Sequence, residues 1–399
     1  MNKIELLAPA GNLEKLKVAL AFGADAIYIG GKEYSLRARA SNFDIEDIKE
    51  AVMLASKYNA KIYVTCNIIA HNEDLDDQDK FKNYIKALDE AGVIGVIVAD
   101  LGMISIIKEV APSLEIHVST QLSTMNSETV NFLESLGASR VVLARECTLD
   151  EIRAIKENSN IELEVFIHGG MCMSVSGKCV LSNYLTNRDA NRGGCAHSCR
   201  WYYDLYDEQG SLVSDNKFTF ASKDLETLNY IKALKEIGVA SLKIEGRMKS
   251  EHYLGTVIGS YRKLLDDIDK NININTKDYQ DEIKKASNRP TSSGFFEGST
   301  SVEQQIFDRA AEIPTQEFVA KVLSYDKESK IAKIEQRNNF NLEQELEVFG
   351  PKLKTTNLVI RELYDEDNNP VVVARHAKQI LYFKSDLELN EYDMIRVKK

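Results

Sequence analysis

Short runs of β-branched and other apolar residues alternate with amphipathic stretches of helical length through the first two-thirds of the chain. Eight runs have the character of strands, and they lie near residues 4–9, 26–30, 61–67, 95–100, 115–121, 140–146, 162–169 and 241–246. The stretches between them carry helix-start signals, with caps at Asn12 and Asp44 and a capping box from Thr148 to Glu151. Eight βα units in about 265 residues predict an α/β fold, a TIM-type (β/α)8 barrel. A doubly wound sheet is the alternative, but no G-x-G-x-x-G follows the first strand.

The pattern breaks after the seventh predicted strand, where residues 169–223 leave the barrel. A βα loop normally takes about two to six residues, so this segment is an insertion. It contains four of the six cysteines, Cys172, Cys179, Cys195 and Cys199, while Cys66 and Cys147 lie far away in sequence. Four thiols can supply all the protein ligands that one metal centre needs. Because βα loops surround the catalytic end of a TIM barrel, we expect a metal site over the barrel mouth.

Three interpretations compete for the four thiols. Disulfides are disfavoured, because the chain starts MNKIELLAPAG without the features of a secretory signal, and we expect a cytoplasmic protein in a reducing compartment. No apolar run is long enough to span a bilayer, so we expect no membrane partner. Zinc prefers pairs with two to four intervening residues, a spacing that only Cys195 and Cys199 approach. The spacing favours an iron–sulfur cluster, with zinc and unligated thiols as alternatives.

Polar residues stand at the ends of the predicted strands, where TIM-barrel enzymes place their chemistry. The candidates after the fifth to eighth strands are Gln121, Arg145, Glu146, His168, Glu245, Arg247 and Lys249. Guanidinium groups match carboxylates in a bidentate manner, so Arg145, Arg247 and Lys249 are suited to holding a small dicarboxylate. Glu146 or Glu245 could move protons. Any of these residues could instead be a helix cap or one half of a structural ion pair.

The character of the chain changes after the eighth unit. Residues 1–270 form the predicted barrel domain, 271–314 a turn-rich linker, and 315–399 a small all-β barrel domain of short strands split by polar turns. The formal net charge of −11 argues against a protein that coats nucleic acid non-specifically. Charge is locally basic in the insertion, however, where Arg200 directly follows Cys199.

The insertion also resembles a known family. The segment Glu164-x-Phe166-x-x-Gly169-x-x-Cys172-x4-Gly177-x-Cys179-x-x-Ser182 is similar to the signature of the collagenase-like peptidase family. One position departs, because Gly170 stands where the pattern usually has serine or alanine, and this leaves every thiol in place. The segments LLAPAG, DAIYIGG, VSTQLS, NRGGCAHSCRWYY, SLKIEGRMKS and RPTSSGFFEG are similar to family segments too.

The resemblance implies hydroxylation rather than proteolysis. The family includes hydroxylation proteins that act on tRNA, on ribosomal RNA or on the ubiquinone ring, and the β-rich tail resembles that of the tRNA branch. Carried over, the four clustered cysteines would bind a [4Fe-4S] cluster. The partner would be tRNA, modified at the wobble uridine to 5-hydroxyuridine, with prephenate as the source of the hydroxyl group. Trp201-Tyr202-Tyr203 and Phe295-Phe296 could stack bases, although a role in the core of the barrel lid is the interpretation we favour.

A peptidase remains the alternative enzyme. The chain has no H-E-x-x-H, and its six histidines give serine or cysteine triads few candidate bases. Cysteines that bind iron cannot also act as nucleophiles, but a mechanism based on Glu146 or Glu245 stays open. A non-catalytic RNA-binding or scaffold protein is the third possibility, and it would leave the polar strand ends and the metal loop without a purpose.

Overall fold

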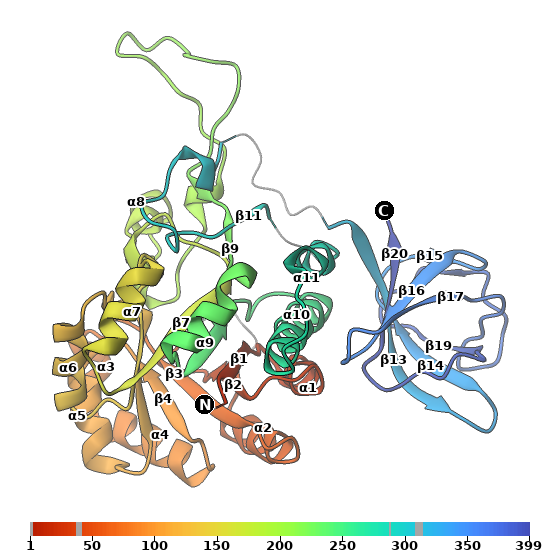
Figure 1. Cartoon of the computed structure of the whole chain (residues 1–399), viewed down its shortest axis with the longest axis horizontal. Coiled ribbons are helices and arrows are strands. Elements are labelled where there is room, and N and C mark those ends of the chain that lie inside the picture. The colour runs from red at the N-terminus through yellow and green to blue at the C-terminus, as the bar shows by residue number, and fades with distance from the viewer. Residues whose placement is uncertain (1–2, 37–41, 287–288, 308–313) are drawn as a thin grey trace. The chain divides into compact units, whose positions relative to one another are not determined.

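Eight parallel strands close into a barrel in the computed structural model, which describes residues 3–36, 42–286, 289–307 and 314–399. The strands are β1 (Glu5–Pro9), β2 (Ala26–Gly30), β3 (Lys61–Cys66), β4 (Gly95–Val98), β5 (Glu115–Val118), β6 (Arg140–Val142), β7 (Glu162–Gly169) and β10 (Ser241–Ile244). Each strand pairs with the next in this order, and β10 pairs with both β7 and β1, which closes the ring (Figure 1). The TIM-type barrel predicted from the sequence is therefore confirmed.

Helices follow the strands around the barrel. They are α1 (Leu13–Ala21), α2 (Ile45–Ser56), α3 (Asn72–Leu75), α4 (Gln78–Glu90), α5 (Leu101–Val110), α6 (Ser127–Ser135), α7 (Leu149–Glu157) and α9 (Ile231–Ile237). The predicted caps are present: the Lys15 amide donates to Asn12 Oδ1 at 2.9 Å, and the Asp47 amide donates to Asp44 Oδ1 at 2.9 Å. These contacts satisfy amides that the first helical turn leaves without a partner.

Charged side chains fill part of the barrel interior. The buried guanidinium of Arg140 lies 2.7 Å from Glu5 and 3.2 Å from Glu164, and the ammonium of Lys243 lies 2.7 Å from Glu164. Burial raises the pKa of Glu164, but the charges of Lys243 and Arg140 outweigh that effect and hold it below its ordinary value. The interior is thus cross-linked between β1, β6, β7 and β10 by paired charges, which are tolerated because each has an opposite partner.

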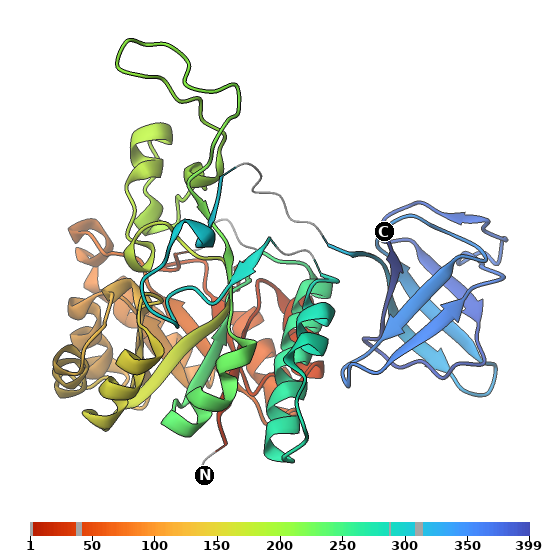
Figure 2. The same cartoon turned by 45° about the horizontal axis from the view of Figure 1, so that its top comes forward.

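The insertion leaves the barrel after β7 and returns through short elements. These are η2 (Val175–Gly177), α8 (Leu181–Thr186), η3 (Ala190–Arg192), η4 (Ser198–Arg200), β8 (Ala221–Ser222), β9 (Asp224–Glu226) and η5 (Leu228–Tyr230). A hairpin at 203–218 projects from it (Figure 2). Two later strands complete the insertion: β11 (Thr291–Ser292) pairs with β9, and β12 (Gln305–Ile306) pairs with β8 after the turn η6 (Val302–Gln304).

The described chain divides into two compact units. The first comprises residues 1–20, 24–248 and 289–312 and holds the barrel and the insertion. The second comprises residues 21–23, 249–288 and 313–399, so α10 (Glu251–Asp269) and α11 (Thr276–Ile283) group with the C-terminal strands. The segment 271–314, predicted as a linker, therefore contains α11, β11 and β12, while its residues 287–288 and 308–313 lie outside the described ranges.

The second unit carries an all-β domain, as predicted. A six-stranded antiparallel sheet runs in the order β17 (Thr355–Val359), β16 (Glu345–Phe349), β20 (Met394–Lys398), β13 (Gln316–Asp326), β14 (Ile331–Gln336) and β19 (Ile380–Lys384). Two short strands, β15 (Phe340–Asn341) and β18 (Val373–Ala374), pair separately. Lys321 and Arg337 each lie 2.8 Å from Glu251 on α10, so this helix is bonded to the sheet within the unit.

None of the helices in the described ranges has the length and apolar character that a membrane span needs.

Candidate functional site

The insertion stands at the carboxyl ends of the barrel strands. Strand β7 ends at Gly169, and there it pairs antiparallel with β9 through His168↔Glu226 and Gly169↔Leu225. The chain thus leaves and re-enters the barrel at one point, next to the end of β10, where the Glu245 amide donates to the His168 carbonyl at 2.8 Å. In TIM barrels this face holds the active site. Figure 2 shows the insertion rising from this end of the barrel.

Glu146 holds the first half of the insertion onto the barrel. Its two carboxylate oxygens accept hydrogen bonds from Ser176, one from the backbone amide at 2.7 Å and one from the hydroxyl at 2.9 Å. Ser176 is buried and has a φ of 49°, a left-handed conformation that is unfavourable for serine and must be held by its contacts. Because Ser176 lies between Cys172 and Cys179, the carboxylate positions the loop that carries these two thiols.

Asn191 and Arg192 hold the second half of the insertion. The Asn191 side chain accepts from the Cys179 amide at 3.3 Å and donates to the Cys179 carbonyl at 3.1 Å, which fixes that backbone on both sides. Arg192 donates to the Ile69 carbonyl at 3.1 Å and forms an ion pair with Asp74, so the insertion is also tied to the loop after β3. The four-cysteine segment is therefore attached to the barrel at several points.

The four clustered thiols share one environment. All are half-buried, and burial raises the pKa of Cys172 and of Cys199, while the neighbouring thiols act on both in the same direction. Arg145 opposes this rise at Cys172 and Arg200 opposes it at Cys199, so each of these two thiols has a cation nearby while its pKa stays above the ordinary value.

The arrangement of the four thiols can be compared with the ligands that each kind of metal group requires. Within the described ranges, no group of three or more His, Cys, Asp or Glu side chains is arranged to hold a metal ion. A four-iron cluster takes one thiolate at each of four separate irons, so its ligands surround a larger object than a single ion. Four grouped thiols in an irregular segment fit that donor requirement.

Cys66 and Cys147 differ from the clustered thiols. Both are fully buried in the barrel, and burial raises the pKa of each to about 12. The Cys147 thiol lies 3.9 Å from the Thr124 carbonyl. These two residues are core positions, unlike the four clustered thiols.

Arg145 braces the start of the insertion. Its guanidinium donates to the Gly170 carbonyl at 2.8 Å and lies over the Phe166 ring, 3.9 Å from the ring centre. The predicted arginine is therefore at the mouth, in contact with the first residue beyond β7.

Arg247 lies across the ends of β2 and β3. It is 3% exposed and donates to Ser35 Oγ at 3.0 Å, to Thr65 Oγ1 at 3.3 Å and to Asn42 Oδ1 at 2.5 Å. A Cβ at Gly30 would come 2.2 Å from its guanidinium, so this arginine needs glycine at the end of β2.

Of the remaining predicted site residues, Gln121 and His168 lie in the barrel unit and Lys249 lies in the second unit. Gln121 is buried, and its amide nitrogen would lie 3.6 Å from a Cβ at Gly177 in the cysteine loop. His168 is buried on β7, beside Glu245 at the end of β10. Lys249 belongs to the second unit, where its ammonium lies 4.9 Å from the centre of the Tyr253 ring. The structure thus brings Gln121, Arg145, Glu146, His168, Glu245 and Arg247 to the barrel unit, and Lys249 falls outside it.

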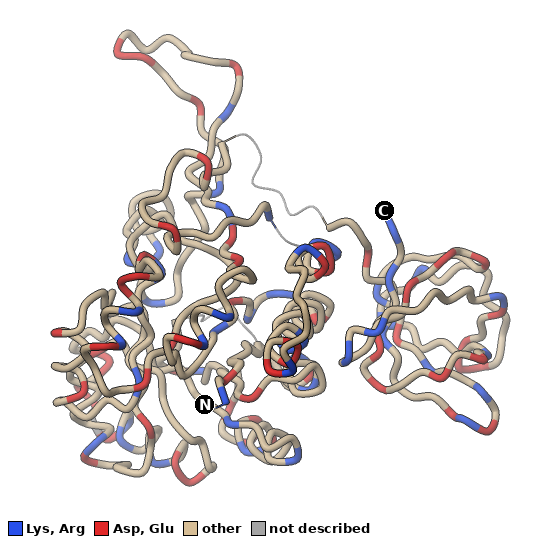
Figure 3. The backbone as a smooth tube through the Cα atoms, in the orientation of Figure 1, with Lys and Arg blue, Asp and Glu red and all other residues tan. Residues whose placement is uncertain are grey.

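The aromatic residues proposed to stack bases separate into two groups. Phe296 is buried against Tyr230, with ring centres 5.4 Å apart, so it is a core residue. Trp201 and Tyr202 are exposed. The hairpin that follows them carries Asp204, Asp207, Glu208 and Asp215 against Lys217 (Figure 3). The charge of this projecting hairpin is therefore negative, which disfavours contact with phosphate groups.

Three charged residues near Gly170 were not among the predicted site residues. Arg289 is 5% exposed and pairs with Asp224, which is fully buried, and Arg200 lies close to both. Burial, and then the charge of Arg289, lower the pKa of Arg200. The sequence offered one signal, since Arg200 follows Cys199 directly. Nothing in the sequence indicated that Arg289, some ninety residues later, returns to this point.

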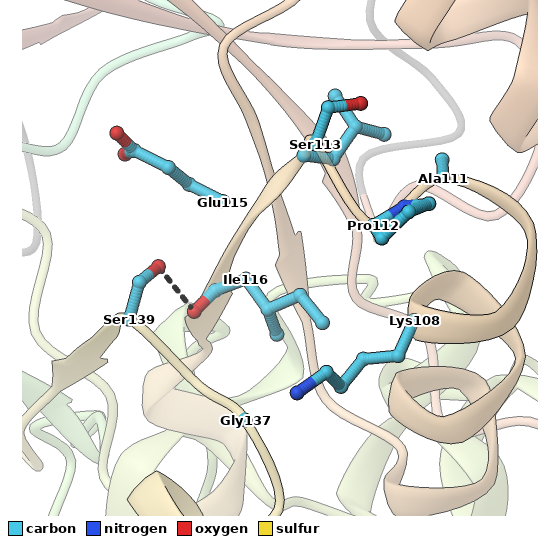
Figure 4. A pocket seen from close by; sticks show the side chains of 9 residues that line it. Lys108, Ala111, Pro112, Ser113, Glu115, Ile116, Gly137 and Ser139 are labelled. Atoms are coloured by element: carbon cyan, nitrogen blue, oxygen red, sulfur yellow. Dashed lines mark hydrogen bonds between the residues drawn. The ribbon is translucent and has the colours of Figure 1, made fainter.

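A cavity of about 260 Å³ lies elsewhere, beside the amino end of β5. It is bordered by the end of α5, by Glu115 and Ile116, and by the turn before β6 (Figure 4). Lys108 extends along it toward Gly137, and the Ser139 hydroxyl donates to the Ile116 carbonyl at 3.1 Å. The amino ends of the strands form the face of a TIM barrel that serves stability, so this cavity is not a candidate for the reaction.

A closed (β/α)8 barrel with a four-cysteine insertion at its mouth defines the class of this protein. Residues 11–306 match peptidase family U32, and residues 314–396 match the peptidase family U32 C-terminal domain. The chain belongs to this family, in agreement with the resemblance seen in the sequence.

Similar proteins in this family carry two kinds of name. The chain is 48% identical to tRNA hydroxylation protein P1 of Bacillus subtilis (strain 168), over 99% of this chain and 95% of that protein. It is 40% identical to the 23S rRNA 5-hydroxycytidine C2501 synthase of Escherichia coli (strain K12), over 67% of this chain and 40% of that enzyme. It is 34% identical to a collagenase of Porphyromonas gingivalis (strain ATCC BAA-308 / W83), over 67% of this chain and 66% of that protein.

Proposed function

We propose that this protein is a cytoplasmic iron–sulfur enzyme that hydroxylates tRNA. The modified position would be the wobble uridine, the product 5-hydroxyuridine, and the linked co-substrate prephenate. The observation that carries the proposal is the 48% identity to a tRNA hydroxylation protein over 99% of the chain, which takes in the barrel, the insertion and the C-terminal domain together. The collagenase-named relative matches 67% of the chain, and at lower identity.

Cys172, Cys179, Cys195 and Cys199 would hold a [4Fe-4S] cluster. When bound through four thiolates, such a cluster would supply electron transfer or structural support. The chain's own contribution is to fix the ligand loops: Glu146 holds the segment between the first two cysteines. Asn191 holds the backbone of Cys179. Tethered ligand loops reduce the conformational entropy lost when a metal group binds.

The other groups at the mouth would bind and position the substrates. Glu245, directly after β10, is the carboxylate proposed to move protons, while Glu146 holds Ser176 by two hydrogen bonds. Arg247 lines the ends of β2 and β3 and would contribute to binding the co-substrate. Arg145 keeps the Gly170 carbonyl in place and is a positioning residue in this scheme.

The experiment is nucleoside mass spectrometry of tRNA from a strain that lacks the gene. Loss of 5-hydroxyuridine derivatives, restored by the wild-type gene and by Cys147→Ser but not by Cys172→Ser, is the expected result. Cys147→Ser is the matched control because its site already offers a carbonyl acceptor to a hydroxyl. Anaerobically purified protein should hold about four irons per chain, and Cys172→Ser should lose them. Stoichiometric zinc in place of iron would overturn the cofactor assignment.

Two other outcomes would redirect the assignment. Unchanged tRNA with altered ribosomal RNA or quinones would indicate hydroxylation of another substrate. A peptidase is the second candidate, favoured by the 34% identity to a collagenase, and it would require unchanged nucleosides together with peptide cleavage by the purified chain.

A further inference from the structure

The first residue beyond β7 borders a space lined by cations. Gly170 has no side chain, and a Cβ placed on it would lie 3.4 Å from Nη2 of Arg200 and 3.4 Å from Nη2 of Arg289. The φ angle of Gly170 is not positive, so its backbone conformation does not require glycine. The missing side chain therefore leaves room between two guanidinium groups without serving a turn.

The charges around this space do not cancel. Arg289 forms an ion pair with the fully buried Asp224, and one of its hydrogen bonds is Nε to Oδ1 at 3.0 Å. Arg200 is half-buried, and its side chain has no hydrogen-bond or ion-pair partner in the ranges that the structure describes. Glu245 Oε2 would be 3.6 Å from the same Cβ position. With Arg145 bound to the Gly170 carbonyl, three guanidinium groups face two carboxylates.

A partly buried guanidinium with carboxylates nearby but no direct hydrogen bond to one can still gain free energy by bonding to an anion that a ligand supplies. The two guanidinium groups border the same space, and Asp224 orients one of them. A guanidinium group can donate two parallel hydrogen bonds to a planar or tetrahedral oxyanion, so two such groups can bind one anion together. Arg200 directly follows Cys199, so this guanidinium belongs to the four-cysteine segment itself.

We propose that Arg200 and Arg289 bind an oxyanion of the substrate, a carboxylate or a phosphate group, in the space beside Gly170. The anion completes the pairing of Arg200 and holds the substrate next to the four-cysteine segment. This inference rests on the proposed function only in taking the barrel mouth as the place where substrate binds. The anion comes from a small carboxylate co-substrate or from a phosphate of the RNA.

The test measures anion binding by the full chain with malonate and inorganic phosphate as probes, using isothermal titration calorimetry. Arg200→Met should weaken the binding of at least one probe by about 10-fold or more, the loss expected for a charge-assisted contact. Arg200→Lys should recover part of the binding, because lysine keeps the positive charge but lacks the paired N–H donors of a guanidinium group. Arg153→Met, the same charge change on the exposed face of α7, is the matched control and should bind like wild type. Melting temperature and iron content measured on each variant report whether the fold and the metal group are retained.

Parallel titrations with tRNA distinguish the two sources. Malonate binding that depends on Arg200, with unchanged tRNA affinity, assigns the site to a small carboxylate. A weaker tRNA affinity and a lower salt dependence in Arg200→Met assign it to an RNA phosphate. If wild type binds neither probe, or if folded Arg200→Met binds both probes and tRNA like wild type, the proposal is overturned. Nucleoside analysis is a separate readout. If Arg200→Met loses anion binding but deletion of the gene leaves the 5-hydroxyuridine derivatives of tRNA unchanged, the anion site stands and the proposed function is refuted.

Discussion

Replacing Glu146 with alanine tests whether this carboxylate fixes the cysteine loop. Its two oxygens accept the amide and the hydroxyl of Ser176 at 2.7 and 2.9 Å. A hydrogen bond to a charged group contributes about 1.5–3 kcal/mol. Glu146 is half-buried, so the lower value applies, and the pair contributes about 3 kcal/mol to the closed loop. This corresponds to roughly a 100-fold change in the opening equilibrium.

Hydrogen exchange followed by mass spectrometry measures that opening directly, because the Ser176 amide is itself one of the two donors. We expect exchange in the segment around Ser176 to become roughly 100-fold faster in Glu146→Ala. Exchange in the barrel strands should change little, since the lost contacts lie outside the barrel. The left-handed φ of Ser176 adds to the effect, because the variant releases a strained residue.

Glu151→Ala is the control on the neighbouring helix. Glu151 accepts a hydrogen bond from the Thr148 amide at 2.7 Å, so its loss frays the start of α7 and leaves the cysteine loop in place. Equal exchange around Ser176 in wild type and Glu146→Ala would refute the reasoning. An equally large effect of Glu151→Ala would show that the change reflects general destabilisation.

Two further predictions concern stability. His252 is buried against Phe318 in the second unit, and burial lowers its pKa to about 3, below the unfolded value of about 6.5. The buried neutral imidazole therefore makes its full contribution to the free energy of unfolding above pH 6.5, and this contribution is lost as the pH falls. Urea unfolding should show a loss of about 2 kcal/mol between pH 7 and pH 5 that is absent in His252→Phe, and an equal loss in both proteins would contradict this assignment. Gly30→Ala would place a Cβ 2.2 Å from the Arg247 guanidinium, so we expect a loss of about 1–3 kcal/mol, seen as a lower melting temperature, and unchanged melting would mean that Arg247 moves aside freely.

The barrel could be predicted from the sequence because its signals are local. Apolar runs of strand length, helical periodicity and caps such as Asn12 and Asp44 each depend on a few neighbouring residues. In the second unit β19 is formed by ILYFK at 380–384, whose β-type residues alternate in burial. The segment PVVVAR at 370–375 has a similar strand-like composition, yet only Val373–Ala374 form a strand. The turn-rich sequence around these segments obscured their boundaries.

The candidate site was predictable only in part, for a physical reason. The four cysteines and the strand-end residues Arg145 and Glu146 stand in motifs that can be read along the chain. Their actual partners are set by tertiary contacts, such as Glu146 with Ser176 in a loop thirty residues later. Arg289 reaches the mouth only because β11 pairs with β9. Contacts of this range leave no periodic trace in one sequence.

Strands β11 and β12 come late in the sequence, and this affects the order in which the insertion can fold during synthesis. β8 pairs with β12, and β9 pairs with β11 as well as with β7, so both strands gain a partner from residues 291–306, about 65 to 85 residues further along the chain. Synthesis at about 5–20 residues per second leaves an interval of roughly 4–16 s between the emergence of the cysteines' segment and that of its closing strands. During that interval the four thiols are already present while the insertion is still open. Slowing translation after residue 226 should lengthen this interval.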